Sequence, residues 1–244
     1  MCGRFVVSQQ ADDLTAVFDA ENDFADWRPS YSLAPTDTIP IVRERAKSDT
    51  GEFVRRLEPA RWNFHPAFMK ESKRPQFNSR IETVATNGLW KGAFASGRCI
   101  VPMRGYYEWT GEPGKKRAHY LHGPDDLLAA AGISTARRLD DGTWEVSTSI
   151  ITREARDASG EIHDRMPVYL PLDAIDHYLD PAKLSPADAQ AMVDFLLAQS
   201  DRVAPTITEH EVDPRVNNHR RIDPHDPALI EPLAETTDEA PTLL

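Results

Sequence analysis

A series of short runs with strand character occupies the middle of the chain and limits the folds that it can adopt. The runs are separated by turns such as GEPGKK and LDDG, which are typical of hairpins. Short strands joined in this way pair antiparallel. The sequence therefore predicts a mostly antiparallel sheet with a barrel-like core. The runs cover residues 98–102, 105–110, 117–122, 127–134 and 143–152.

Helices are predicted to flank this core, which makes the fold class α+β. Residues 185–198 give the clearest helix, because Ser185 suits the N-cap and Pro186 the first helical position. Shorter helices are expected over 9–20, with Ser8 as N-cap, and over 83–95, ending near Gly97. Further strands are expected over 4–8, 39–45, 51–58 and 207–212, and irregular segments over 21–37 and 63–76.

The charge of the chain is uneven along its length. It holds 39 acidic and 28 basic residues, for a net charge of −11. Residues 223–244 contain six acidic residues and no Lys or Arg, so the remainder carries only −5. We therefore expect one domain over residues 1–222 and a disordered acidic tail over 223–244. The acidic balance argues against non-specific binding to nucleic acid, but it does not exclude a local basic groove.

The sequence predicts a cytoplasmic protein, nucleoid-associated if bacterial, that needs no metal or organic cofactor. There is no apolar run of about 18 residues and no signal-peptide pattern at the start. The two cysteines, Cys2 and Cys99, form no CxxC pair, and the histidines show no HExxH spacing. Cys99 lies in an apolar run, so we expect it to be buried and inert.

Cys2 is the residue with the most distinctive chemistry. Methionine is normally removed before a small second residue, and its loss would leave Cys2 with a free α-amine beside its thiol. An amine with a pKa of roughly 7.7–8.0 forms a Schiff base with an aldehyde, and the neighbouring thiol can then close a thiazolidine ring. We expect a nearby cation, Arg4, to favour the thiolate. An incidental cysteine is the plainer alternative.

Four sequence blocks, in this order and spacing, resemble the SRAP family of abasic-site processing proteins, also called SOS-response-associated peptidases. They are MCGRF at the start, NSRIET at 78–83, RCIVPMRGYYEW at 98–109 and HDRMP at 163–167. SLAPT at 32–36 and Trp62 also fit family positions. The resemblance implies autocatalytic loss of Met1 and binding of single-stranded DNA. It also implies a covalent thiazolidine link to the opened sugar of an abasic site, with reversal or lyase chemistry as a further capacity.

The same resemblance assigns catalytic roles to Cys2, Asn78, Glu108 and His163. The Asn78 amide would bind sugar oxygens or the α-amine. Glu108 lies between Tyr107 and Trp109 and should have a raised pKa, which suits proton transfer. His163 would donate a proton to a sugar oxygen. Without the family, a turn Asn, a solvent-facing Glu and a surface His would be the plainer interpretations.

DNA binding is assigned to cations for phosphates and to apolar side chains for bases. One departure from the family pattern affects the expected path of the DNA strand. After Trp62 the family continues with glycine and an aliphatic pair, whereas this chain has Asn63-Phe64-His65. The DNA-binding candidates are Arg4, Arg80, Trp109, Phe68, Met69, Thr152 and Arg165. The expected partner is single-stranded DNA with abasic sites, bound by a monomer without a membrane; the sequence identifies no replication-fork protein.

Three other functions remain open. An N-terminal-nucleophile glutamine amidotransferase also begins Met-Cys-Gly, and Asn87-Gly88 could mimic its oxyanion hole, but its His-Thr-Arg-Trp segment does not occur here. A non-covalent single-strand binder would leave Cys2 idle. A protease acting on other proteins is not favoured, because no GxSxG motif occurs.

Overall fold

A closed ring of five strands forms the centre of the protein. The computed structural model describes residues 2–47, 49–70, 74–112 and 114–233. Within the ring the order is β11-β10-β7-β4-β5, and a parallel contact between Ser147 and Arg61 joins β11 back to β5. The other ring pairs are antiparallel, so the predicted mostly antiparallel, barrel-like α+β fold is confirmed. The ring strands are β4 (Thr38–Ala46), β5 (Phe53–Arg61), β7 (Arg98–Met103), β10 (Leu128–Arg138) and β11 (Trp144–Glu154).

A second sheet carries the start of the chain into the interior. Its order is β14-β9-β8-β1-β3, so β1 lies between two neighbours and is buried at every position. Only Arg104 separates β7 from β8, so the chain passes directly from the ring into this sheet. Its strands are β1 (Phe5–Val7), β3 (Ser30–Leu33), β8 (Gly105–Thr110), β9 (Arg117–His122) and β14 (Thr208–Val212).

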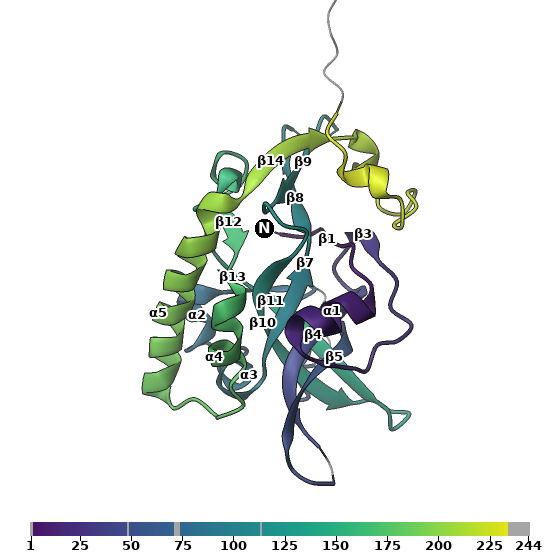
Figure 1. Ribbon diagram of the computed structural model, residues 1–244. Coiled ribbons are helices and arrows are strands. Elements are labelled where there is room, and N and C mark those ends of the chain that lie inside the picture. The colour runs from purple at the N-terminus through teal and green to yellow at the C-terminus, as the bar shows by residue number, and fades with distance from the viewer. Residues whose placement is uncertain (1, 48, 71–73, 113, 234–244) are drawn as a thin grey trace, which may run out of the picture.

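The α-helices pack mainly around the ring of strands. Helix α5 (Pro186–Val203) runs along one side next to α4 (Ile175–Leu179), while α1 (Ala11–Phe18) lies on the other side (Figure 1). The predicted start of α5 is confirmed: Ser185 is its N-cap and accepts from the backbone of Asp188. None of the described helices combines the length and hydropathy needed to cross a membrane. The 3-10 turns are Ala158–Glu161, Leu172–Ala174, Ala204–Thr206, Pro214–Asn217 and Pro227–Ile230.

Several local predictions were wrong. The N-cap of α1 is Gln10 rather than Ser8, and its backbone N–H donates to Asp13 at 3.3 Å. The helix expected over 83–95 is two helices, because the Asn87 side chain accepts from the Leu89 N–H and makes a turn. These two helices are α2 (Ile81–Val84) and α3 (Lys91–Ser96). The segment 21–37 contains strands. The elements that were missed are β2 (Glu21–Asn22), β3, β6 (Asn78–Arg80), β12 (Arg165–Pro167), β13 (Tyr169–Leu170) and α4.

The first part of the acidic tail is ordered, against the prediction of disorder from residue 223. Pro224 accepts a hydrogen bond from the Tyr31 N–H at 2.6 Å, and Leu229 is fully buried. The physical reason is that Leu229 packs on a small apolar cluster that includes Val6 and Tyr107 on the outer face of the second sheet. Residues 234–244 of the predicted tail lie outside the described part of the chain.

We expect Leu229→Ala to lower the free energy of unfolding by about 2–4 kcal/mol, because it leaves a cavity beside Tyr107. Leu233→Ala is the matched control: Leu233 is 45% exposed, so its loss should cost less than about 1 kcal/mol. Urea unfolding of both variants measures the difference. Equal and small effects would mean that the segment 223–233 does not pack on the sheet in solution.

Candidate functional site

The start of the chain is held where strands from both sheets meet. Cys2 is fully buried, and its carbonyl accepts a hydrogen bond from the Asn78 side-chain amide at 2.8 Å. Asn78 begins β6 and pairs with Ile150 on β11. On the other side, the Tyr107 N–H of β8 donates to the Arg4 carbonyl at 2.9 Å. The cysteine block, the NSR block and the GYYEW block therefore meet at Cys2.

The thiol of Cys2 is not activated in the way that the sequence predicts. Burial, and after it the Glu108 carboxylate, raise the pKa of Cys2 far above its ordinary value. Arg4 does not offset this, because its guanidinium donates to the Ser32 hydroxyl and the Val216 carbonyl, each at 3.1 Å. The thiol is therefore protonated at neutral pH, and a base must take its proton before the sulfur can act as a nucleophile.

Glu108 has the properties of that base. Its side chain is on β8 and only 3% of the residue is exposed. Burial raises the pKa of Glu108 to about 7, and the Asp157 and Asp164 carboxylates act in the same direction. The raised value agrees with the sequence-based expectation. A carboxyl group with a pKa near 7 is present in both protonation states at neutral pH, so it can accept and donate protons.

His163 is poised to donate a proton from one defined ring nitrogen. Its Nδ1 accepts the Arg165 N–H at 3.0 Å, although the Asp164 carboxylate also lies 2.9 Å from Nδ1. Burial lowers the pKa of His163, and Asp164 is 85% exposed, so we take the ring as neutral. A neutral ring whose Nδ1 accepts a hydrogen bond carries its proton on Nε2.

Asn78 keeps one open hydrogen-bonding position. Its amide nitrogen is engaged by the Cys2 carbonyl, but its Oδ1 is buried and has no partner among the described residues. A buried acceptor without a partner is costly, so such atoms are often completed by a ligand. An α-amine or a sugar hydroxyl would supply the missing donor.

Two of the predicted DNA-binding residues have structural roles instead. The two terminal nitrogens of the Arg165 guanidinium, Nη1 and Nη2, donate to the Glu82 carboxylate at 2.6 and 3.0 Å. Nη2 also donates to the Thr152 carbonyl at 2.7 Å. Thr152 is fully buried and its hydroxyl donates to the Ser79 carbonyl. Arg165 thus clamps β12 to α2 and β11, and Thr152 has no surface that a DNA strand could reach.

Arg4 and Trp109, two further DNA-binding candidates, contact each other. The Arg4 guanidinium lies 5.7 Å from the centre of the Trp109 ring, within cation–π range. The Trp109 indole N–H donates to Asn217 at 2.6 Å. Arg4 is largely committed to protein partners, whereas Trp109 is half-buried near the end of β8, on the opposite face of that strand from Glu108.

The remaining DNA-binding candidates differ in exposure. Arg80 is exposed and makes none of the ion pairs found in the described part of the chain. Phe68 is 73% exposed and lines a cavity of about 520 Å³ together with α3 and Ser134. Neither Cys2 nor Glu108 borders that cavity, so the structure does not bring Phe68 to the cysteine. Met69 is half-buried, and its carbonyl lies 3.0 Å from the His65 ring.

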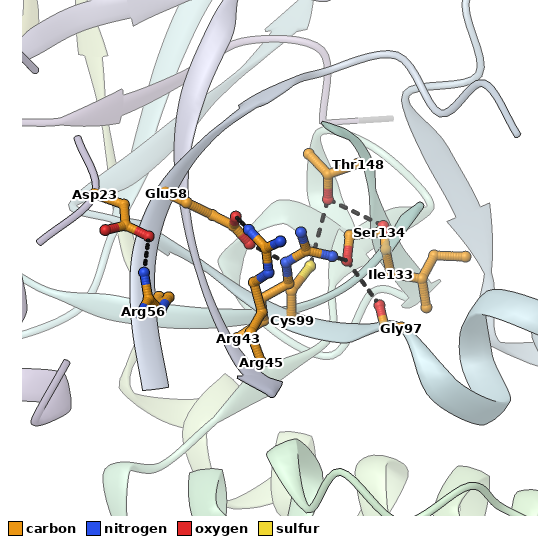
Figure 2. Close-up of polar contacts among 10 residues, drawn as sticks. All are labelled: Asp23, Arg43, Arg45, Arg56, Glu58, Gly97, Cys99, Ile133, Ser134 and Thr148. Atoms are coloured by element: carbon orange, nitrogen blue, oxygen red, sulfur yellow. Dashed lines mark hydrogen bonds and ion pairs between the residues drawn. The ribbon is translucent and has the colours of Figure 1, made fainter. Parts of the chain in front are cut away.

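Cys99, on β7, belongs to a separate polar cluster that includes Thr148 on β11. Figure 2 shows its sulfur facing the Thr148 hydroxyl at 3.4 Å, beside an ion-pair network in which Arg43 and Arg45 share Glu58. Burial raises the pKa of Cys99 to about 11, which leaves the thiol protonated. Its predicted burial is confirmed.

The sequence missed several groups around Cys2. Tyr106 and Tyr169 are fully buried, and Asp157 accepts a hydrogen bond from the Tyr106 hydroxyl at 3.1 Å. Alternation along GYYEW could have placed Tyr106 on the same side of β8 as Glu108. No local signal marks Asp157 or Tyr169, because long-range packing brings them there.

Other features bear on the alternative functions. Among the described residues, no three His, Cys, Asp or Glu side chains converge in a way that could hold a metal ion. Gly88 lines the same cavity as Phe68, and the Asn87 side chain is used in the turn before α3. The Asn87-Gly88 pair is therefore not arranged as an oxyanion hole for Cys2.

Comparison with known proteins agrees with this geometry. The profile of the SOS response associated peptidase (SRAP) family matches residues 1–219. The chain belongs to the SRAP family. Its blocks NSRIET and GYYEW meet at the chain start in a fold of that family.

Relatives and solved structures extend the comparison over most of the chain. Abasic site processing protein YoaM of Bacillus subtilis (strain 168) is 30% identical over 199 residues, covering 79% of this chain and 85% of the relative. Abasic site processing protein YedK of Escherichia coli (strain K12) is 30% identical over 187 residues, covering 73% and 79%. A crystal structure from Bacteroides thetaiotaomicron has a TM-score of 0.77 at 20% identity and covers 96% of this chain, which shows the same fold.

The raised pKa of Glu108 predicts a specific pH dependence of stability. Between its ordinary value of 4.5 and about 7, the unfolded state loses this proton more readily than the folded state, so Glu108 destabilises the fold as pH rises. Glu108→Gln removes that effect. Relative to the native chain, the variant should gain on the order of 3 kcal/mol from about pH 4 to about pH 8.

Urea unfolding of both proteins across this pH range measures the difference. The exposed Glu112→Gln is the control and should change by little, because its side chain is solvated in both states. A difference between Glu108→Gln and the native chain that stays constant with pH would contradict a raised pKa.

Proposed function

We propose that this protein captures abasic sites in single-stranded DNA through a covalent thiazolidine link to Cys2, exposed by removal of Met1. The observation that carries the proposal is the environment of Cys2: a buried cysteine at the chain start, held by Asn78, beside a carboxyl group with a pKa near 7. The names of the relatives YoaM and YedK, both abasic site processing proteins, support the choice of DNA lesion.

The chemistry joins one aldehyde to one cysteine with loss of one water. The α-amine of Cys2 attacks the aldehyde carbon of the ring-opened sugar, and the resulting carbinolamine loses water to give an imine. The sulfur then bonds to the same carbon, and the thiol proton ends on the nitrogen. The product is a five-membered thiazolidine, and the reverse sequence releases the DNA.

The residues of the site supply the proton transfers that these steps need. Ionised Glu108 takes the proton from the buried thiol, and protonated Glu108 donates to the leaving hydroxyl of the carbinolamine. The Nε2–H of neutral His163 donates to a sugar oxygen during ring opening. The open Oδ1 of Asn78 accepts from the α-amine or from a sugar hydroxyl and so orients the nucleophile.

Recognition of the lesion comes from the aldehyde rather than from base sequence. Arg80 supplies a phosphate contact, because it is exposed and unpaired within the described residues, and half-buried Trp109, beside Arg4, supplies an aromatic surface. Phe68 and Met69 would contact the strand farther from the lesion. Glu108 also serves as the acid/base for release of Met1, and the same site supports lyase chemistry through the imine.

Of the other functions, non-covalent binding of single-stranded DNA is the one that the experiment must distinguish from covalent capture. It would use the same exposed groups but would leave Cys2 without a role. An amidotransferase is not favoured, since the Asn87-Gly88 turn borders a cavity that does not include Cys2.

The direct test is a denaturing gel with an oligonucleotide that carries one abasic site. Protein with a mass-verified Cys2 terminus should give a shifted band that survives denaturant, and Cys2→Ala should abolish it. Cys99→Ser is the matched control and should retain the band, because Cys99 is buried in a separate cluster. DNA with a borohydride-reduced site has no aldehyde and should give no band.

A shifted band that persists in Cys2→Ala would place the chemistry elsewhere. Absence of a band with the native site, despite binding to the oligonucleotide, would favour the non-covalent binder.

Arg80 and Arg165 are expected to have different roles, the first in DNA binding and the second in stability. Arg80→Ala should reduce by about one the slope of log binding constant against log salt for undamaged single-stranded DNA, without changing thermal stability. Arg165→Ala should lower the melting temperature, because it leaves Glu82 without its bidentate partner. Fluorescence anisotropy at several salt concentrations and thermal unfolding measure the two effects. The opposite pattern would mean that Arg165, not Arg80, contacts phosphate.

A further inference from the structure

Asp157 is a carboxylate that the fold holds in one position close to Glu108. It caps the 3-10 turn Ala158–Glu161, where its Oδ1 accepts from the Ser159 N–H at 2.9 Å and from the Ser159 hydroxyl. Its Oδ2 accepts from the Tyr106 hydroxyl at 3.1 Å. These three hydrogen bonds fix the position and orientation of the carboxylate. A fixed negative charge is therefore anchored at this position.

Tyr106 connects this charge to the site. Tyr106 and Glu108 are two residues apart on β8, so their side chains project from the same face of the strand. Tyr106 is fully buried, and its hydroxyl reaches Asp157 in the segment that follows β11. The anchored carboxylate thus contacts the side of β8 on which both Tyr106 and Glu108 are buried.

The other charged and titratable groups around Glu108 are less suited to this effect. On β9, His119 is opposite Glu108, but its two ring nitrogens contact Glu209 at 3.1 Å and Thr110 at 2.8 Å. Before β12, His163 is neutral and Asp164 is 85% exposed, so solvent screens its charge. At the chain start, the α-amine of processed Cys2 would add a positive charge that draws the proton off Glu108.

We propose that Asp157, anchored by Tyr106, is a positioning residue whose charge keeps Glu108 able to hold a proton at neutral pH against the opposing α-amine. The inference rests on the proposed function, because it concerns the acid/base group of the thiazolidine reaction. Burial is the main cause of the raised pKa of Glu108, and Asp157 is the first of the two carboxylates that add to it. Without Asp157, Glu108 would be mostly ionised when the carbinolamine needs an acid.

The test measures the ionisation of Glu108 directly and the reaction separately. Protein with a free Cys2 terminus, released from a cleavable leader, is labelled with carboxyl ¹³C-glutamate and titrated by NMR. The Glu108 signal is the one missing in Glu108→Gln. Asp157→Asn keeps an oxygen that can cap the turn but removes the charge, and should move the Glu108 midpoint down by on the order of half a pH unit.

Two tyrosine variants complete the design. Tyr106→Phe removes the anchor of Asp157 and should move the midpoint in the same direction. Tyr178→Phe is the matched control: Tyr178 is also a fully buried tyrosine, but its hydroxyl donates to the Gly132 carbonyl at 2.7 Å rather than to Asp157. It should leave the midpoint unchanged. The pH profile of adduct formation should follow the midpoint in each variant.

The outcomes separate the inference from the proposed function. A Glu108 midpoint that is the same in Asp157→Asn, Tyr106→Phe and the native chain overturns the role of Asp157, whether or not the protein forms an adduct. A midpoint that moves as expected, in a protein that never forms an adduct with abasic DNA, supports the charge coupling and removes the proposed function instead.

Discussion

The insertion of the first strand between β3 and β8 is the constraint on which the rest of the site depends. Strand β1 has only three residues, yet all are fully buried, and Phe5 packs edge-on against Trp62 with ring centres 4.8 Å apart. Because β1 is an interior strand, Cys2, three residues before its start, is drawn into the protein rather than left in solvent. The Asn78 hydrogen bond to the Cys2 carbonyl then fixes the cysteine against the ring of strands.

Burial of the chain start sets the electrostatics of the site. The same desolvation that holds the Cys2 thiol protonated also raises the pKa of Glu108 into the neutral range. The two shifts are complementary, because a thiol that cannot ionise alone lies beside a carboxyl group that can exchange a proton. The cation that the sequence offered for this purpose, Arg4, is instead used to tie β1 to the loop at Val216.

Several arginines of this acidic protein are paired with carboxylates rather than left free for a ligand. Arg165 is neutralised by Glu82, and Arg43 and Arg45 share Glu58 in the buried cluster of Figure 2. Exposed Arg80, at the end of β6, is thus better placed for a phosphate than Arg165. A chain with a net charge of −11 would then bind a strand through a small local surface, with an affinity that falls as salt rises.

The sequence by itself determined the long strands, helix α5 and the family, because each rests on local patterns: the hairpin turns, the Ser185-Pro186 start and four ordered blocks. It also predicted the burial of Cys99 and the direction of the Glu108 shift. Only the tertiary structure decided that Arg165 is paired with Glu82, that Thr152 is buried, that Leu229 covers the second sheet, and that Asp157 lies near Glu108. These depend on contacts between residues far apart in the chain, and β6, β12 and β13, which carry or adjoin several of them, are too short to show a periodic pattern.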